Sequence, residues 1–402
     1  MLRFLTAGES HGKALVAILE GLPAGLRIDV DAITTDLRRR QTGYGRGRRM
    51  AIESDRAEPV SGIRHGVSTG NPIALLIPNK DWENWQRTMY AEPEMPEGAT
   101  GADRPPVTRP RPGHADLAGF VKYGHEDMRN VLERASARET AARVAIGAIA
   151  RQLLRCVGAE IVSHVTAIGA ASVANPTAYS FAQIRDLPID TPLHCADPSV
   201  EQQMIAAIDR ARDTGDTMGG SFEIIAHAVP PGLGSYVQWD RKLDGRLAQA
   251  LMSIPAIKAV GIGIGPAVAN LPGSRVHDEI VAGGSSPFPG LARPTNNAGG
   301  LEGGVTNGED LRVTAYMKPI STLMKPLRSV DLATMTESPA TIERSDVCAV
   351  PAAAVVGEAM VAIVLADAVL EKFGGDSIDE IQAHYAATAE QIRRRFDRSR
   401  SA

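Results

Sequence analysis

An apolar run near the end of the chain constrains the fold more than any other feature. "CAVPAAAVVGEAMVAIVLADAVL" extends from Cys348 to Leu370 and is long enough to cross a bilayer as a helix. Glu358 and Asp367 interrupt it, however, and charged side chains are costly inside a bilayer. We therefore expect a helix buried on nearly all sides in the core of a large soluble protein. Because hydrophobic residues make up 44% of the chain and aromatic residues only 4%, this core should consist of Ala, Val, Ile and Leu.

The first part of the chain predicts two strands followed by helices. Residues 2–30 have the pattern of a strand, a Gly-rich turn and an apolar strand, and "VDAITTDLRRRQ" follows as a helix with Asp29 or Asp31 as its cap. Ser136 and Glu139 have the spacing of a capping box. The Ala-rich segment after them, which is apolar nearly all round, is therefore expected to be a buried helix.

Strands and helices continue in mixed order after that helix. Strands are expected at "AEIVSHVTAIGAAS", "GGSFEIIAHAVP" and "AIKAVGIGIG", and helices at "SVEQQMIAAIDRARDTG" and "DRKLDGRLAQALMSI". Residues 83–113 hold many prolines and have the pattern of a long irregular loop, a kind of segment that is usually functional. The mixed order favours an α+β fold over a regular βαβ array. Length alone suggests two or three domains.

Charge and cysteine content exclude several classes of protein. The net charge is −4 and the pI about 6.2, which argues against a general nucleic-acid-binding protein. Cys156, Cys195 and Cys348 are far apart and odd in number, so they fit neither a disulfide framework nor a zinc site. The chain also begins without the pattern of a signal peptide. We therefore expect a cytoplasmic protein that acts on neither nucleic acid nor a membrane.

Arginine is concentrated in a few short segments. Arg outnumbers Lys 35 to 8, and "LRRRQTGYGRGRRM" contains no acidic residue. "TRPRPGH" and "ERASAR" add further arginines beside His114 and at the start of the Ala-rich helix. Since Arg binds carboxylates and phosphates bidentately, these segments predict a site for a small polyanion, with a solvated basic loop as the alternative. Tyr44 is the one aromatic in the first cluster, so base stacking is not favoured.

Glycines border a polar triplet near the N-terminus. "TAGESHGKAL" sets Glu9, Ser10 and His11 between Gly8 and Gly12. This pattern suits either a polar turn that faces water or a loop that a ligand can approach closely. "GIGIGPAVA" is a weak match to a dinucleotide-binding turn, and "NNAGGLEGGVTNG" lacks the Gly-Lys-Ser/Thr of a P-loop.

Eight motifs together resemble the chorismate synthase family. They are "GESHG", "RRRQTGYGRG", "TRPRPGHAD", "KYG", "RASARETAARVAIGAIA", "AGGLEGG", "MKPIST" and "RSDVCAVPAA". They occur in the family's order from residue 3 to about residue 375. The resemblance does not extend to the C-terminal tail.

The resemblance implies a fold and a reaction. The expected fold is α+β, a single-domain β-α-β sandwich with long core helices between antiparallel sheets, with a catalytic domain over 1–375 and a C-terminal helix and tail over 376–402. The implied activity is that of a carbon–oxygen lyase: anti-1,4-elimination of phosphate from 5-enolpyruvylshikimate 3-phosphate to give chorismate. The reaction requires reduced FMN without net redox change, and NADPH is a candidate reductant of the flavin. A homotetramer is expected.

The resemblance also implies site residues. The catalytic residues are His11, His114 and Asp346. The substrate ligands are Arg40, Arg46, Arg49 and Arg109; Arg40 and Arg46 are positions that the family sometimes assigns to a nicotinamide nucleotide. The cofactor ligands are Ser10, Arg134, Ala135, Ser136, Pro255, Ala256, Gly303, Lys318, Pro319, Ile320, Ser321, Thr322 and Arg344. At position 255 the family commonly has a polar amide residue, so proline removes any side-chain hydrogen bond there. No metal site is expected.

Two other functions remain as alternatives. A flavin-dependent redox enzyme would oxidise or reduce its substrate. A non-catalytic Arg-rich binding protein would hold polyanions with steep salt dependence and no turnover.

Overall fold

A computed structural model describes residues 1–47, 54–284, 288–343 and 345–397 of the chain. Its helices and antiparallel sheets form an α+β structure, as predicted. The smaller main sheet has the order β1 (Arg3–Ala7), β2 (Ala14–Glu20), β6 (Ile73–Pro78) and β3 (Glu58–Ser61). The larger has the order β10 (Ile257–Ile262), β15 (Leu311–Met317), β9 (Gly220–His227), β7 (Glu160–Ile168) and β8 (Ala171–Ser172).

Alternation along the strands decides which sheet face is buried. In β2, Leu15, Ala17 and Leu19 are buried, while Ile18 between them is exposed and lies opposite Leu5 of β1. In β9, Phe222 and Ile224 face the main core, and Ile225 on the other face packs in a second cluster. Period-two alternation thus turns one face of each sheet toward the helices.

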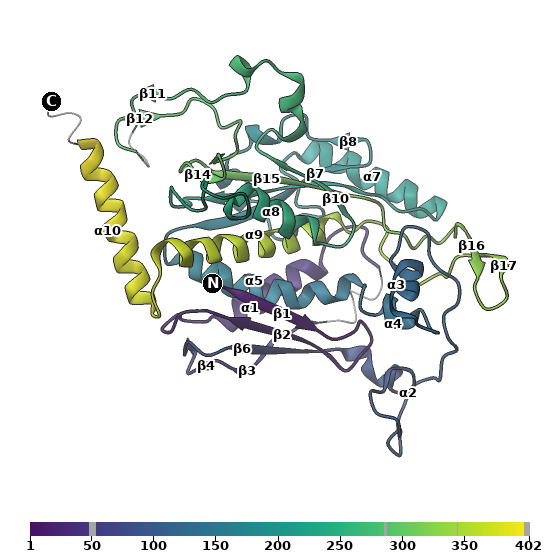
Figure 1. Ribbon diagram of the computed structural model, residues 1–402. Coiled ribbons are helices and arrows are strands. Elements are labelled where there is room, and N and C mark those ends of the chain that lie inside the picture. The colour runs from purple at the N-terminus through teal and green to yellow at the C-terminus, as the bar shows by residue number, and fades with distance from the viewer. Residues whose placement is uncertain (48–53, 285–287, 344, 398–402) are drawn as a thin grey trace.

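Three helices lie between the two sheets (Figure 1). They are α1 (Val30–Gln41), α5 (Thr140–Arg155) and α9 (Val350–Phe373). α5 contacts β2 and β6 of the smaller sheet, α9 contacts β7 and β9 of the larger, and α5 and α9 pack on each other. They approach so closely that a Cβ at Gly147 would lie 2.3 Å from the Cβ of Ala359. Small residues therefore set the spacing of this layer.

The predicted core helix is confirmed as α9. Within the described residues, it is the one helix that is long and apolar enough to cross a membrane by length and composition. Its most apolar window is 89% buried inside the protein. The apolar surface is thus buried against α5 and the larger sheet.

The other elements lie around these three helices and the sheets, and the helix at Leu243–Met252 packs on both α9 and β10 of the larger sheet. The remaining helices are α2 (Gln86–Met89), α3 (Asp116–Tyr123), α4 (Arg129–Leu132), α6 (Phe181–Arg185), α7 (Pro198–Thr214), α8 (Leu243–Met252) and α10 (Ile378–Asp397), which projects from the body in Figure 1. Short strand pairs are β4 (Ile63–Arg64) with β5 (Val67–Ser68), β11 (Val281–Ala282) with β12 (Leu291–Ala292), β13 (Leu301–Glu302) with β14 (Val305–Thr306), and β16 (Arg328–Asp331) with β17 (Thr336–Pro339). Single 3₁₀ turns occur at Lys80–Asn84, Ala137–Glu139, Pro176–Ala178, Trp239–Arg241, Gly265–Asn270 and Gly273–Arg275.

Two predicted helix starts have different outcomes. Asp29 caps α1, and its carboxylate accepts from the backbone N–H groups of Asp31 and Ala32. Ser136 caps the 3₁₀ turn before α5, but the predicted capping box is wrong: Glu139 forms an ion pair with Arg143 instead of turning back. A charged partner four residues on satisfies this carboxylate better than a backbone N–H does.

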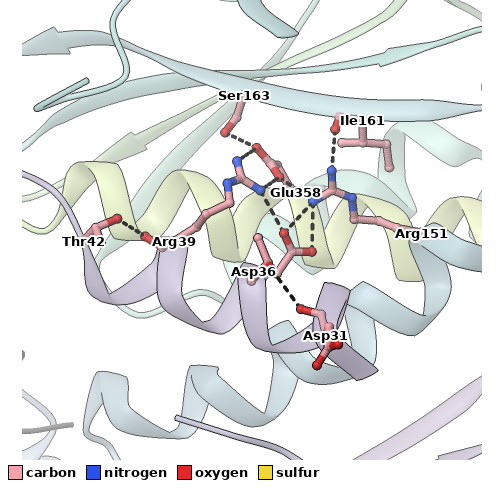
Figure 2. Close-up of polar contacts among 9 residues, drawn as sticks. Asp31, Asp36, Arg39, Thr42, Arg151, Ile161, Ser163 and Glu358 are labelled. Carbon is pink, nitrogen blue, oxygen red and sulfur yellow. Dashed lines mark hydrogen bonds and ion pairs between the residues drawn. The ribbon is translucent and has the colours of Figure 1, made fainter. Parts of the chain in front are cut away.

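A closed ion cluster lies inside the helical layer (Figure 2). Both Nη atoms of Arg39 donate to the carboxylate of Glu358 at 2.8 Å, and Arg151 donates to Glu358 and to Asp36. Ser163 of β7 also donates to Glu358. Burial by itself would raise the pKa of Glu358, but the charges of both arginines and these hydrogen bonds outweigh it and lower the pKa to about 2.

Candidate active site

A cavity of about 1880 Å³ brings most of the predicted site residues together. Its walls come from the β1–β2 turn, the start of α5, the loop before α3, the start of β10 and the end of β15. The predicted residues that line it are Ser10, His11, Arg40, Arg46, Arg109, His114, Ala135, Ser136, Pro255, Ala256, Lys318, Ile320, Ser321, Thr322 and Asp346. Segments more than 300 residues apart in the sequence therefore meet at one site.

The β1–β2 turn places His11 at the cavity. Gly8 has a φ of 101°, and a Cβ there would lie 2.3 Å from the carbonyl oxygen of Ala14, so the tight turn requires glycine. His11 Nδ1 lies 2.9 Å from both carboxylate oxygens of Glu133, and the backbone N–H of His11 donates to Glu133 at 2.8 Å. The ring stacks on Trp85 with the two centroids 3.9 Å apart. Ser10 and His11 of the polar triplet thus line the cavity, while Glu9 is exposed.

His114 is held by a second carboxylate. Its Nδ1 lies 2.5 Å from Asp116 Oδ1, so Nδ1 carries the proton of this hydrogen bond. Asp116 also accepts from Arg111 Nε and Nη2, and Arg111 in turn donates to Thr322. Burial by itself would raise the pKa of Asp116, but the bonds from His114 and Arg111 lower it well below its usual range.

Arg40 places its guanidinium in a buried region beside other charged side chains. Its Nη2 donates to Asp55 at 3.0 Å, and Asp55 also receives both bonds of Arg138 Nη1. Arg40 Nε has no hydrogen-bond partner among the described residues. Burial, together with the charges of Arg138 and Arg46, outweighs Asp55 and lowers the pKa of Arg40 to about 10. An arginine whose positive charge is poorly compensated in this way is suited to bind an anion.

Asp346 joins two of the predicted segments. Arg46 Nη1 lies 2.7 Å from Asp346 Oδ2, and the backbone N–H of Gly47 donates to Asp346 Oδ1 at 2.7 Å. A predicted substrate ligand and a predicted catalytic carboxylate are therefore neighbours. Arg49 and Arg344, also predicted as ligands, lie outside the described residues.

Three predicted cofactor ligands lie elsewhere. Arg134 does not line the cavity; its guanidinium donates to the carbonyls of Thr6 and Gly8 and so anchors the end of β1. Pro319 is outside the lining although its neighbours line it. Gly303 lies in the β13–β14 hairpin beside Tyr236. This hairpin is near the first residue of β15, whereas Lys318 follows the last residue of β15. At about 3.3 Å per residue, β15 separates these two ends by about 20 Å.

Sequence reasoning missed several residues of this site. They are Asp55, Trp85, Glu133, Asp116 and Lys258, of which all but Asp55 and Asp116 line the cavity. Asp116 could have been found from its position two residues after His114. Trp85 and Glu133 carried no such signal, because their relation to His11 exists only in three dimensions.

The cavity has more cationic than anionic side chains. Arg40, Arg46, Arg104, Arg109, Arg111, Arg129, Arg138, Lys258 and Lys318 line it, against Asp81, Glu133, Asp331, Glu343 and Asp346. Burial and the charge of Lys258 lower the pKa of Lys318. Within the described residues no group of His, Cys, Asp and Glu could hold a metal ion. The surplus of positive charge suits a ligand with several negative groups.

Known proteins are similar to this chain in sequence and in fold. The sequence pattern of the family described as chorismate synthase matches residues 2–370. The chain is 58% identical over 387 residues to the chorismate synthase of Moorella thermoacetica, covering 96% of this chain and 98% of that protein. It is 56% identical to the chorismate synthase of Desulforudis audaxviator, covering 98% of each. A crystal structure of a chorismate synthase superimposes with a TM-score of 0.76 at 42% identity, covering 98% of both chains.

Proposed function

The chain belongs to the chorismate synthase family, and we propose that the cavity described above is where it acts. A chorismate synthase is a lyase of the shikimate pathway, which leads to the aromatic amino acids. It eliminates phosphate and a ring hydrogen from 5-enolpyruvylshikimate 3-phosphate and forms chorismate. The predicted function therefore agrees with the family, and the proposals concern how this chain's residues perform the reaction.

The charge of the cavity is the observation that carries this assignment. The substrate has two carboxylates and a phosphate, and FMN adds a second phosphate. At 4 Å, two unit charges interact by about 4 kcal/mol at an effective dielectric near 20. Burial, and after it the charges of Arg138 and Arg46, lower the pKa of Arg40 to about 10, so a bound anion would offset both the lost hydration and the repulsion among these cations. We assign substrate binding to Arg40, Arg46 and Arg109.

Reduced FMN is the proposed cofactor, and the donor set fits it. Ser136 begins a 3₁₀ turn that leads into α5, and helix starts offer N–H groups to phosphates. Ala135 and Ser136, Pro255 and Ala256, and Lys318 with Ile320 to Thr322 line the same cavity. When bound, reduced FMN would supply electrons to the reacting substrate and regain them before product leaves, so the reaction would involve no net redox change. NADPH is the proposed reductant of the flavin. Arg134 would act indirectly, by anchoring β1.

The two histidines are the proposed proton carriers. Both hold Nδ1 against a carboxylate, which leaves Nε2 of His11 for the cavity; Nε2 of His114 lies 3.4 Å from Arg111 Nη2. Histidine is the side chain that most often acts as a general acid or base. Asp346, held by Arg46 and by the N–H of Gly47, is proposed as the carboxylate that accepts a proton.

Further features of the protein are also proposed. We assign it to the cytoplasm, because Cys156, Cys195 and Cys348 are free thiols. We propose the family's β-α-β sandwich, since α5 and α9 pack on each other, α5 packs on β2 and β6 of the smaller sheet, and α9 packs on β7 and β9 of the larger. We propose a homotetramer, which would cover apolar side chains such as Leu5 and Ile18 on the outer face of the smaller sheet.

One assay tests the function. The protein is incubated anaerobically with 5-enolpyruvylshikimate 3-phosphate and chemically reduced FMN, and chorismate and phosphate are followed. We expect both products in equal amounts without net oxidation of the flavin, and a turnover in His11→Ala and His114→Ala that is lower by about 10²–10⁴-fold. Net oxidation or reduction of the substrate would point to a redox enzyme, and binding without product to a polyanion-binding protein.

A further inference from the structure

We infer that Glu133 is the positioning residue of His11. The carboxylate of Glu133 lies 2.9 Å from His11 Nδ1 through both oxygens and accepts from the backbone N–H of His11 at 2.8 Å. It thereby holds the proton on Nδ1, so that a proton exchanged with a ligand in the cavity moves at Nε2. The inference rests on the proposed function in one respect, namely that His11 acts in the elimination.

Glu133 is itself rigidly placed. Its side chain is fully buried, and its backbone N–H donates to the carbonyl of Arg129 at 3.0 Å, at the end of α4. Its backbone carbonyl accepts from the N–H of Ser10 at 3.0 Å. Backbone and side chain of one residue therefore hold Ser10 and His11 together. A group with this many fixed contacts can orient another to the accuracy that proton transfer requires.

The negative charge of Glu133 is compensated by one ion-pair partner among the described residues. A buried carboxylate is expensive unless a cation or several donors compensate it. Among the described residues, His11 is the only ion-pair partner of Glu133. Asp116, the corresponding carboxylate beside His114, shares its charge with Arg111. The contact between Glu133 and His11 is thus not a by-product of a larger salt-bridge network.

Trp85 restrains the same ring on its face. The Trp85 and His11 rings stack at an interplanar angle of 20°, and Trp85 Nε1 donates to Asp81 Oδ2 at 3.0 Å. The guanidinium of Arg104 lies 4.0 Å from the centre of the Trp85 ring. Glu133 fixes the edge of the imidazole and Trp85 fixes its plane, which leaves Nε2 as the edge available to a ligand.

The test combines kinetics with a spectroscopic readout of the ring. Glu133→Ala and Glu133→Gln are compared with Glu139→Ala, a matched variant that removes a neighbouring buried glutamate paired with Arg143 and not with a histidine. We expect Glu133→Ala to lower kcat about 10–100-fold, as when other carboxylates that orient histidines are removed, with KM changed less than about threefold. Glu133→Gln, which keeps an acceptor oxygen, should restore part of kcat. Glu139→Ala should stay within about threefold of wild type.

The ¹⁵N NMR signals of the imidazole report the position of the proton without any turnover. The His11 signals are identified by their loss in His11→Ala. We expect an Nδ1–H form in the wild type and a mixture of tautomers in Glu133→Ala. A kcat within threefold of wild type, or unchanged ¹⁵N signals, would overturn the inference while the proposed function stood. If the wild type made no chorismate, the proposed function would fail, and the NMR comparison would still decide whether Glu133 holds the ring.

Discussion

Arg39 and Arg40 are neighbours on α1, yet they belong to two different electrostatic regions. Arg39 points into the closed cluster of Figure 2, where both of its Nη atoms donate to Glu358 at 2.8 Å. Arg40 points to the cavity, where it makes one bond to Asp55 and leaves Nε without a partner among the described residues. Successive residues on a helix differ by about 100° in direction, which is enough to separate the two side chains.

The difference lies in charge balance. In the closed cluster two arginines, Arg39 and Arg151, face two carboxylates, and the charge of Glu358 raises the pKa of Arg39. Beside the cavity, Arg40 and Arg138 both donate to the carboxylate of Asp55, and burial lowers the pKa of Arg40 to about 10. Removing a carboxylate from the balanced cluster would leave buried cations uncompensated, whereas the proposed substrate anion would compensate the cations beside the cavity.

Removing Glu358 should have the largest effect and tests whether the closed cluster stabilises the protein. Glu358→Ala leaves Arg39 and Arg151 buried without their shared carboxylate, so we expect the free energy of unfolding to fall by about 3–5 kcal/mol. Urea denaturation measures it. The control is Glu371→Ala, which removes an exposed glutamate of the same helix, paired with Arg241, and should cost about 1 kcal/mol or less. Equal losses in the two variants would show that the closed cluster contributes no special stability.

Lowering the pH tests the same comparison through the carboxylate of Glu358. The pKa of Glu358 is about 2 in the folded protein and about 4.3 in an unfolded chain. A lowered folded pKa gives stability that is fully present above pH 4.3 and is lost as the pH falls toward 2. The loss from this group is about 3 kcal/mol. Unfolding free energies measured from pH 6 to pH 2.5 should therefore fall more steeply in wild type than in Glu358→Gln; parallel curves would contradict the assignment.

Exchanging each arginine for methionine separates stability from function. Arg40→Met leaves Asp55 paired with Arg138, so stability should change by less than about 1 kcal/mol, while the loss of a charged hydrogen bond to substrate should lower kcat/KM about 10–100-fold. Arg39→Met should do the reverse: lower stability with near-normal kcat/KM for the folded protein. The measurements are steady-state kinetics and urea denaturation on both variants. Normal kinetics in Arg40→Met would remove Arg40 from the site.

Two helix-capping serines give the smallest and most specific test. Ser136 caps the turn at the cavity, and Ser180 caps α6 away from it with a complete capping box. Replacing either with alanine should cost about 1 kcal/mol of stability. Only Ser136→Ala should also weaken binding of reduced FMN, as measured by anaerobic titration. If both variants bind flavin like wild type, the proposed flavin contact at Ser136 is wrong.

Local sequence patterns predicted the elements well because their causes are local. The cap at Asp29, the alternation of β2 and the apolar length of α9 each depend on residues close in sequence. The capping box failed because Arg143, one turn further on, offered Glu139 a better partner. The family motifs named most of the residues that line the cavity, but not where each one points.

Partners that come from distant segments could not be predicted. Nothing in "LRRRQ" tells Arg39 from Arg40, because Glu358 is 319 residues from Arg39 and Asp55 is 15 residues from Arg40. Glu133 is 122 residues from His11. Gly303 matched a family motif, yet in a single chain it lies at the far end of β15 from Lys318. Its predicted contact with flavin remains a prediction.

The place of α9 in the chain has a consequence for synthesis on the ribosome. α9 contacts α5, β7 and β9, all of which are made earlier, yet its last residue is Phe373 in a chain of 402. Until this segment leaves the exit tunnel, the apolar surfaces of α5, β7 and β9 that pack against α9 stay uncovered. Nascent chains in this condition aggregate readily. We therefore expect the nascent protein to depend on chaperones until α9 has left the tunnel, and chains that terminate before Val350 to be insoluble although they contain nearly all of the residues that line the cavity.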